Sequence, residues 1–172
     1  MRETVDRARL QRFLEELSRA ARETTRLYLT GGASQLLRGL RDSTVDVDLT
    51  LDPERDDMLR AMLALKESLN LNVEIVSPAH FVPALPGWRD RYPFVGQFGQ
   101  LAVYHFDPYT QVLSKLERGH DRDTVDVQAL VREGIVDPDR LRALFAQVEG
   151  ELFRYPAIDG KSLRATVHRL SR

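Results

Sequence analysis

The chain has 172 residues, close to the usual length of one globular domain. Hydrophobic residues make up 42% and charged residues 30%, a balance that excludes a disordered chain and a membrane-embedded one. The formal net charge of -1 gives no global field that would hold a polyanion, and the absence of cysteine excludes disulfides and thiolate metal ligands. No apolar run approaches the roughly 20 residues that cross a bilayer, so we expect a cytoplasmic protein without membrane contact.

In the first half of the chain, the spacing of apolar residues predicts helices that alternate with strands. The expected elements are a helix over 4–22, a strand over 27–29, a helix over 33–40, a strand over 44–51, a helix starting at Asp52-Pro53-Glu54 with Asp52 as its cap, and a strand over 73–76. Residues 83–99 are rich in proline and glycine, which predicts a loop, interpreted as a flap that faces the substrate.

The second half of the chain is predicted to be mainly helical. After a strand over 101–106, the expected helices cover 109–118, 124–133, 138–153 and 162–170. The predicted fold class is therefore α+β. A small mixed sheet flanked by helices occupies residues 1–106, and a helical part over 107–172 packs on it to give one compact domain.

Two acids stand two residues apart on the strand over 44–51. Because alternate residues of a strand point to the same face, Asp46 and Asp48 can share a hard divalent cation whose remaining positions are filled by nucleotide phosphates. Two ions, Mg²⁺ or Mn²⁺, would stabilise the attacking and leaving oxygens of a displacement at phosphorus, which usually needs a third carboxylate. Glu74 is the candidate. The alternative is an acidic edge strand that resists aggregation, with Glu74 a solvated strand residue.

Thirteen residues separate a glycine turn, Gly31-Gly32, from Asp46. Gly31 and Gly32 would let backbone amides approach a phosphate, and the helix that follows offers its positive N-terminal end. Ser34 would add a hydroxyl contact, and Arg38 would reach a triphosphate. The alternatives are a plain strand-to-helix turn for the glycines and a solvated position for Arg38.

Together these motifs resemble the signature of the DNA polymerase β-like nucleotidyltransferase superfamily. That signature is a hydrophobic residue, Gly, then Gly or Ser, and, roughly a dozen residues later, Asp-x-Asp on a strand. Thr30-Gly31-Gly32 and Asp46-Val47-Asp48 meet it, with threonine at the hydrophobic position. The resemblance implies that the paired acids bind two magnesium ions and that Glu74 is the third acid on a neighbouring strand.

A later segment, 114–127, is similar to a motif of the minimal, AbiEii-toxin-like (DUF6036-like) branch of this superfamily. The branch carries a lysine, then Arg-Asp, then an Asp, and Lys115, Arg122, Asp123 and Asp126 match it in order. The resemblance implies that the lysine contacts nucleotide phosphate and that the segment is nucleotide-binding. The alternatives are an ordinary surface lysine and a loop ion-pair cluster of Asp121, Arg122 and Asp123 that only organises the helix junction.

The sequence thus predicts a nucleotidyltransferase that moves a nucleoside monophosphate from an NTP such as ATP to an acceptor hydroxyl, releasing pyrophosphate. The acceptor would be tRNA, a protein or a small molecule, and the resemblance adds the hypotheses of a toxin role and an antitoxin partner. The alternative is a nucleotide-binding or protein-interaction module of the same fold without turnover. The four histidines are too scattered to predict a zinc site, so none is given a role.

Overall fold

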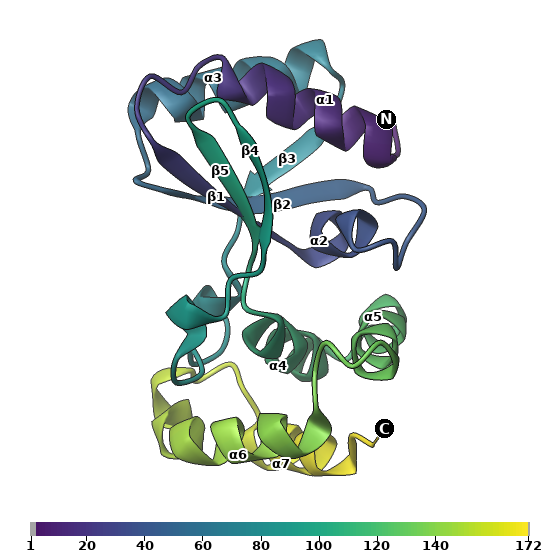
Figure 1. Ribbon diagram of the computed structural model, residues 1–172. Helices are drawn as coiled ribbons and strands as arrows, with labels where there is room; N and C mark the ends of the chain where they lie inside the picture. The colour runs from purple at the N-terminus through teal and green to yellow at the C-terminus, as the bar shows by residue number, and fades with distance from the viewer. Residues whose placement is uncertain (1–2, 172) are drawn as a thin grey trace. The chain divides into compact units, whose positions relative to one another are not determined.

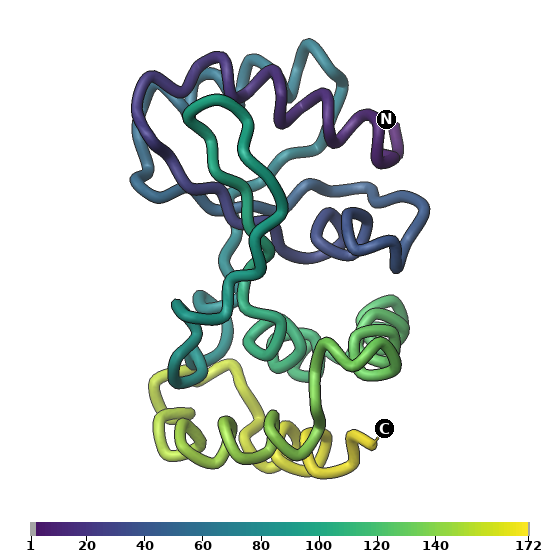
Figure 2. The backbone as a smooth tube through the Cα atoms, in the orientation of Figure 1, coloured from purple at the N-terminus to yellow at the C-terminus, as the bar shows by residue number. Residues whose placement is uncertain are grey.

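The computed structural model describes residues 3–171 and confirms the predicted α+β fold. The described residues divide into two compact units, the first made of 3–77 and 93–106 and the second of 78–92 and 107–171. The chain therefore passes from one unit to the other after residues 77, 92 and 106, as its colour allows the reader to follow in Figure 2. The expected packing of 1–106 and 107–172 as one compact domain stays a prediction.

A five-stranded mixed sheet forms the centre of the first unit (Figure 1). Its strands are β1 (Thr25–Thr30), β2 (Asp46–Asp52), β3 (Asn72–Ile75), β4 (Phe94–Phe98) and β5 (Leu101–His105). In the order β3-β2-β1-β5-β4, β1 pairs antiparallel with β2 and parallel with β5. β3 runs parallel to β2, and β4 forms an antiparallel hairpin with β5.

Three helices complete this unit: α1 (Arg7–Ser18), α2 (Gly31–Leu37) and α3 (Asp56–Ser68). α1 and α3 lie across one face of the sheet (Figure 1). Their apolar stripes pack on the strands in one core, to which α2 adds Ala33 and Leu36. The alternation predicted for β2 is confirmed. Val47 and Leu49 are fully buried in this core, and the half-buried residues that alternate with them, Asp46, Asp48 and Thr50, lie on the opposite face.

Two local predictions in the first unit are wrong. Asp52 does not cap α3, because it is the last residue of β2 and pairs with Arg26 across the ladder, so the helix begins only at Asp56. The segment 83–99, predicted to be a loop, contains β4. This strand is held by its hydrogen bonds to β5, and the proline and glycine residues of the segment gave no local sign of that pairing.

The second unit is helical, with α4 (Pro108–Arg118), α5 (Asp121–Arg132), α6 (Pro138–Val148) and α7 (Gly160–Arg169). Single turns of 3-10 helix occur at Pro78–His80 and Trp88–Asp90, and a longer one follows α6 at Glu149–Arg154. The segment 78–92 is fixed to α4, because both terminal oxygens of Asp107 accept hydrogen bonds at 2.9 Å from the guanidinium of Arg91. No helix of the described chain is long and apolar enough to cross a membrane.

Candidate active site

The predicted carboxylates lie on one face of two adjacent strands. On β2, Asp46 and Asp48 are half-buried on the face opposite the core. In the parallel ladder with β3, Asp48 stands beside Glu74 and Asp46 beside Asn72. Asn72 Nδ2 donates a hydrogen bond to Asp46 Oδ1 at 2.6 Å, which fixes the orientation of that carboxylate. The register therefore brings the third predicted acid next to the Asp-x-Asp pair.

This donor set suits a hard cation. Carboxylate oxygens are the ligands that Mg²⁺ and Mn²⁺ prefer, and this face offers them from two neighbouring strands. Within residues 3–171, however, no three His, Cys, Asp or Glu side chains are gathered closely enough to hold a metal ion. The metal-binding roles of Asp46, Asp48 and Glu74 accordingly stay predictions.

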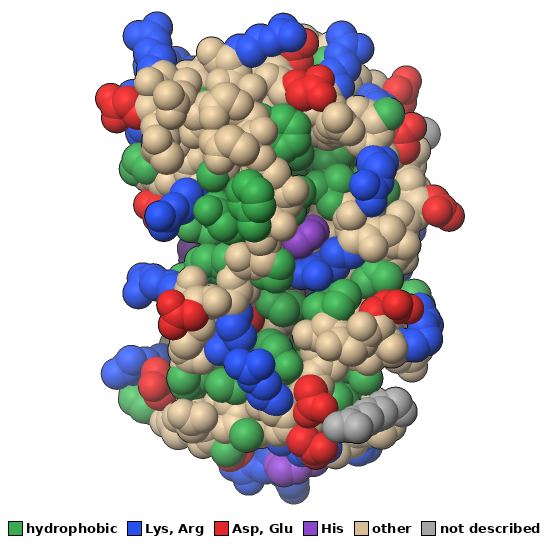
Figure 3. All heavy atoms as spheres, in the orientation of Figure 1, with side chains coloured by type: hydrophobic (Ala, Val, Ile, Leu, Met, Phe, Trp, Pro, Cys, Tyr) green, Lys and Arg blue, Asp and Glu red, His purple; other side chains and the backbone are tan. Residues whose placement is uncertain are grey.

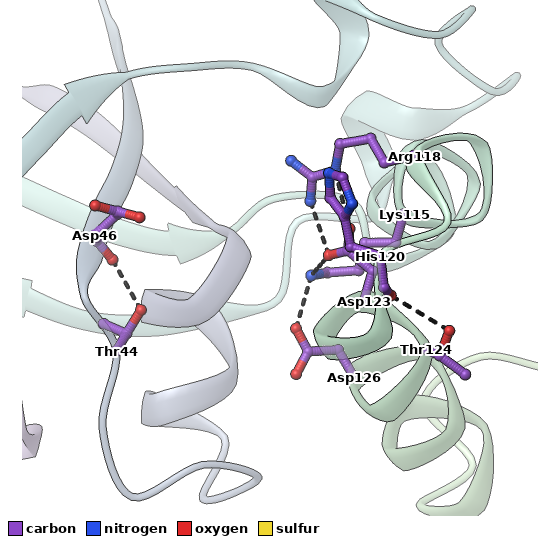
Figure 4. Close-up of polar contacts among 8 residues, drawn as sticks. All are labelled: Thr44, Asp46, Lys115, Arg118, His120, Asp123, Thr124 and Asp126. Carbon is purple, nitrogen blue, oxygen red and sulfur yellow. Dashed lines mark hydrogen bonds and ion pairs between the residues drawn. The ribbon is translucent and has the colours of Figure 1, made fainter.

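The glycine turn has a packing role that the sequence did not reveal. Gly31 has a φ of +56°, and a Cβ atom there would lie 2.7 Å from Asp48 Oδ2. At Gly32 a Cβ would overlap Thr44 Oγ1, the hydroxyl that donates to the backbone oxygen of Asp46 at 3.0 Å (Figure 4). Both glycines therefore allow α2 to begin directly against the acidic strand.

One face of α2 is polar although it is buried. Ala33 and Leu36 point into the core, so helical periodicity places Ser34, Gln35 and Arg38 on the other side, with Gly31 at the start of that side. Ser34 and Gln35 are each 1% exposed. Burial lowers the pKa of the Arg38 guanidinium, because the charged form is less well solvated there.

His105 is a site residue that sequence reasoning missed. It ends β5, is 7% exposed, and its Nδ1 is hydrogen-bonded to Ser34 Oγ at 2.9 Å. Burial, together with the nearby charge of Arg38, lowers the pKa of His105 to about 3, so the imidazole is neutral at physiological pH. Ser34 and His105 are 71 residues apart in sequence, and only the parallel pairing of β1 with β5 brings them together.

The second predicted motif forms a buried ion cluster in the second unit (Figure 4). Lys115 is 4% exposed, and its Nζ donates to Asp123 Oδ1 at 2.9 Å and to Asp126 Oδ2 at 2.7 Å. The alternative of a surface lysine is therefore wrong. Arg122 lies exposed on the same helix as these acids, α5.

Arg118 completes this cluster by donating two hydrogen bonds to Asp123, at 2.9 and 3.1 Å. Burial by itself would raise the pKa of Asp123, but the hydrogen bonds and charges of Lys115 and Arg118 outweigh it and hold that pKa below its usual value. The cluster therefore joins α4 to α5, but through Lys115, Arg118 and Asp126 with Asp123 rather than through the loop ion pairs of Asp121, Arg122 and Asp123 that were the alternative. The predicted contact with phosphate stays a prediction.

A cavity of about 750 Å³ in the second unit contains none of the predicted site residues. It is lined by the end of α5, the turn after it and the start of α6, with Val131, Val136 and Pro138 among its apolar residues. Its polar and charged lining residues are Gln128, Arg132, Asp137 and Ser171, of which only one is an acid, so the carboxylate face remains the better candidate for chemistry.

The fold and the paired acids after a glycine turn are those expected of a nucleotidyltransferase. A family model matches residues 8–167, and the chain belongs to that family, DUF6036, described as a nucleotidyltransferase of unknown function. This match confirms the resemblance inferred from the motifs. No curated protein and no solved structure matches the chain.

Proposed function

We propose that this protein transfers a nucleoside monophosphate from a nucleoside triphosphate, such as ATP, to an acceptor hydroxyl. The observation that carries the proposal is the ladder between β2 and β3, which aligns Asp48 with Glu74 while Asp46 shares their face. These three residues would hold two Mg²⁺ or Mn²⁺ ions. When bound, such ions supply positive charge that stabilises the attacking and leaving oxygens of an in-line displacement.

The proposed reaction forms one bond at phosphorus and breaks another. The acceptor oxygen attacks the α-phosphorus, and the bond from that phosphorus to the oxygen bridging the β-phosphate breaks. Pyrophosphate leaves with the electron pair, and the proton of the hydroxyl passes to a carboxylate oxygen of Glu74. Catalysis would come mainly from positioning and charge stabilisation, as in phosphoryl transfer generally.

The α2 region would hold the triphosphate. Gly31 and Gly32 keep the backbone open beside the acids, Ser34 offers a hydroxyl, and Arg38 offers a poorly solvated positive charge. For Lys115, Arg122, Asp123 and Asp126, the nucleotide-binding role rests on the family resemblance. The Lys115 ammonium has three N–H donors, and Asp123 and Asp126 each accept one, so the third would serve a phosphate oxygen.

The candidates for the acceptor are tRNA, a protein hydroxyl and a small molecule. A toxin role, with an antitoxin protein as the partner, likewise rests on the resemblance. Net charge argues for an acceptor recognised through local contacts, because the whole chain carries only -1.

The test is transfer of label from each of four α-labelled NTPs, with Mg²⁺ or Mn²⁺, to total tRNA or to the protein itself. Wild type should transfer label, and Asp46→Asn and Asp48→Asn should each lower the rate at least about 100-fold because metal coordination is lost. Asp52→Asn is the matched control, since this exposed acid ends the same strand away from the site and should leave the rate unchanged. If wild type neither transfers label nor binds NTP in a metal-dependent way, the enzyme proposal is overturned. The alternative of a protein-interaction module with this fold would then be favoured.

A further inference from the structure

Unsatisfied polar atoms are concentrated on the buried face of α2. Among the described residues, three buried side-chain atoms lack a hydrogen-bond partner: Nε2 and Oε1 of Gln35, and Nη2 of Arg38. Because Gln35 and Arg38 are three residues apart in sequence, they share one face of the helix. An unpaired buried polar atom destabilises the folded state, so three such atoms on α2 and its C-cap residue, Arg38, indicate that the missing partner is a ligand.

The chemistry of the unpaired atoms separates two parts of that ligand. Arg38 Nη2 can only donate, and a phosphate oxygen, which only accepts, is its natural partner. Gln35 offers a donor and an acceptor together, and phosphate cannot satisfy the amide oxygen. The partner of Gln35 must carry a donor and an acceptor, as a nucleobase edge or a ribose hydroxyl does.

We propose that Gln35 binds the nucleoside part of the substrate through both amide atoms, while Arg38 binds its phosphates. The inference rests on the proposed function, because it assumes a nucleotide ligand. The face begins beside the acids, since Gly31 lies one helical turn before Gln35 and against Asp48. Gln35 is 1% exposed in the free protein, so the face must open for the nucleotide to enter. The unpaired atoms make the closed form costly and therefore easy to open.

The test compares two ligands on full-length variants. Gln35→Met keeps the length of the side chain and removes both polar atoms. With Mn²⁺ present, calorimetry would measure binding of α,β-methylene analogues of the four NTPs and of inorganic tripolyphosphate, which lacks a nucleoside. We expect Gln35→Met to weaken binding of the preferred NTP analogue about tenfold or more, and to leave tripolyphosphate binding unchanged. Arg38→Met should weaken both ligands.

Thermal unfolding of the same variants separates a binding role from a structural one. Gln35→Met should unfold at the same temperature as wild type or higher, because it removes two unpaired buried atoms. Gln11→Met, at an exposed position of α1 in the same unit, is the matched control and should bind both ligands as wild type does.

Two results would overturn the inference: equal NTP affinity in Gln35→Met and wild type, or equal weakening of NTP and tripolyphosphate. The failure of the proposed function looks different. Wild type would then transfer no label, yet a loss of NTP affinity specific to Gln35→Met would still support the nucleoside contact. Wild type that binds neither ligand would overturn both proposals.

Discussion

A single buried histidine links the acidity of the medium to the stability of the candidate site. The pKa of His105 is about 3 in the folded protein, against about 6.5 for an unfolded chain. Between these values the unfolded chain binds the proton more tightly. The stabilisation is therefore complete above about pH 6.5 and is lost as the pH falls toward 3.

We predict that the free energy of unfolding decreases from pH 7 to pH 4.5 by at most about 1.4 kcal/mol per unit through this one group. His105→Asn, which keeps a hydrogen-bond partner for Ser34 but does not titrate, should have a flatter profile in urea unfolding. His80→Asn is the control, because His80 is exposed. Parallel profiles for wild type and His105→Asn would contradict the assignment.

At the scale of elements, α4 and α5 are joined by ions rather than by apolar contacts alone. Lys115 is the cation between Asp123 and Asp126, and all three side chains are buried. Removing one partner of a buried pair leaves the remaining charges without compensation. The cluster should therefore contribute to stability whether or not nucleotide binds there.

We predict that Lys115→Met lowers the free energy of unfolding by about 3–5 kcal/mol, measured by urea denaturation at pH 7. Lys161→Met, at an exposed position of α7, should change it little. A double variant that carries Lys115→Met together with Asp126→Asn should regain part of the lost stability, because it removes the uncompensated charge of Asp126. An unchanged urea midpoint in Lys115→Met would contradict a structural role for this lysine and favour a role in ligand binding.

Elements with a strong apolar period were predictable from sequence, and those defined by distant partners were not. β2 shows both its core face and its acids in its own alternation, so Asp46 and Asp48 were found directly. Glu74 could be proposed, but its place beside Asp48 depends on a strand register that no local pattern encodes. His105 and Gln35 gave no signal, because a contact across the sheet and an unpaired amide exist only after folding.

At the scale of the whole molecule, neither unit is one continuous segment. Residues 78–92 belong to the second unit but are joined at both ends to strands of the first. Unfolding of the first unit should therefore release the anchors of the second and favour one cooperative transition. On the face shown in Figure 3, acidic and basic side chains are interspersed, so that face carries charges of both signs.

The only tryptophan makes this coupling measurable. Trp88 lies in the second unit, whereas Leu29, fully buried, lies in the core of the first. We predict that Leu29→Ala, which should cost about 2–5 kcal/mol, shifts the urea midpoint seen by Trp88 fluorescence as much as the midpoint seen by circular dichroism. Leu63→Ala, at an exposed position of α3, is the control and should shift neither. A Trp88 midpoint that does not move with Leu29→Ala would show independent units.

The strand order also has a consequence for the growing chain on the ribosome. β1, β2 and β3 are synthesised first, but β1 needs β5 on its other edge, through pairs such as Thr25 with Leu101. Until residues 101–105 have emerged, that edge presents unpaired amides and carbonyls to any neighbouring chain. The place between β1 and β4 is thus filled by the last strand of the sheet to be made, and the nascent protein is most vulnerable to aggregation just before β5 arrives.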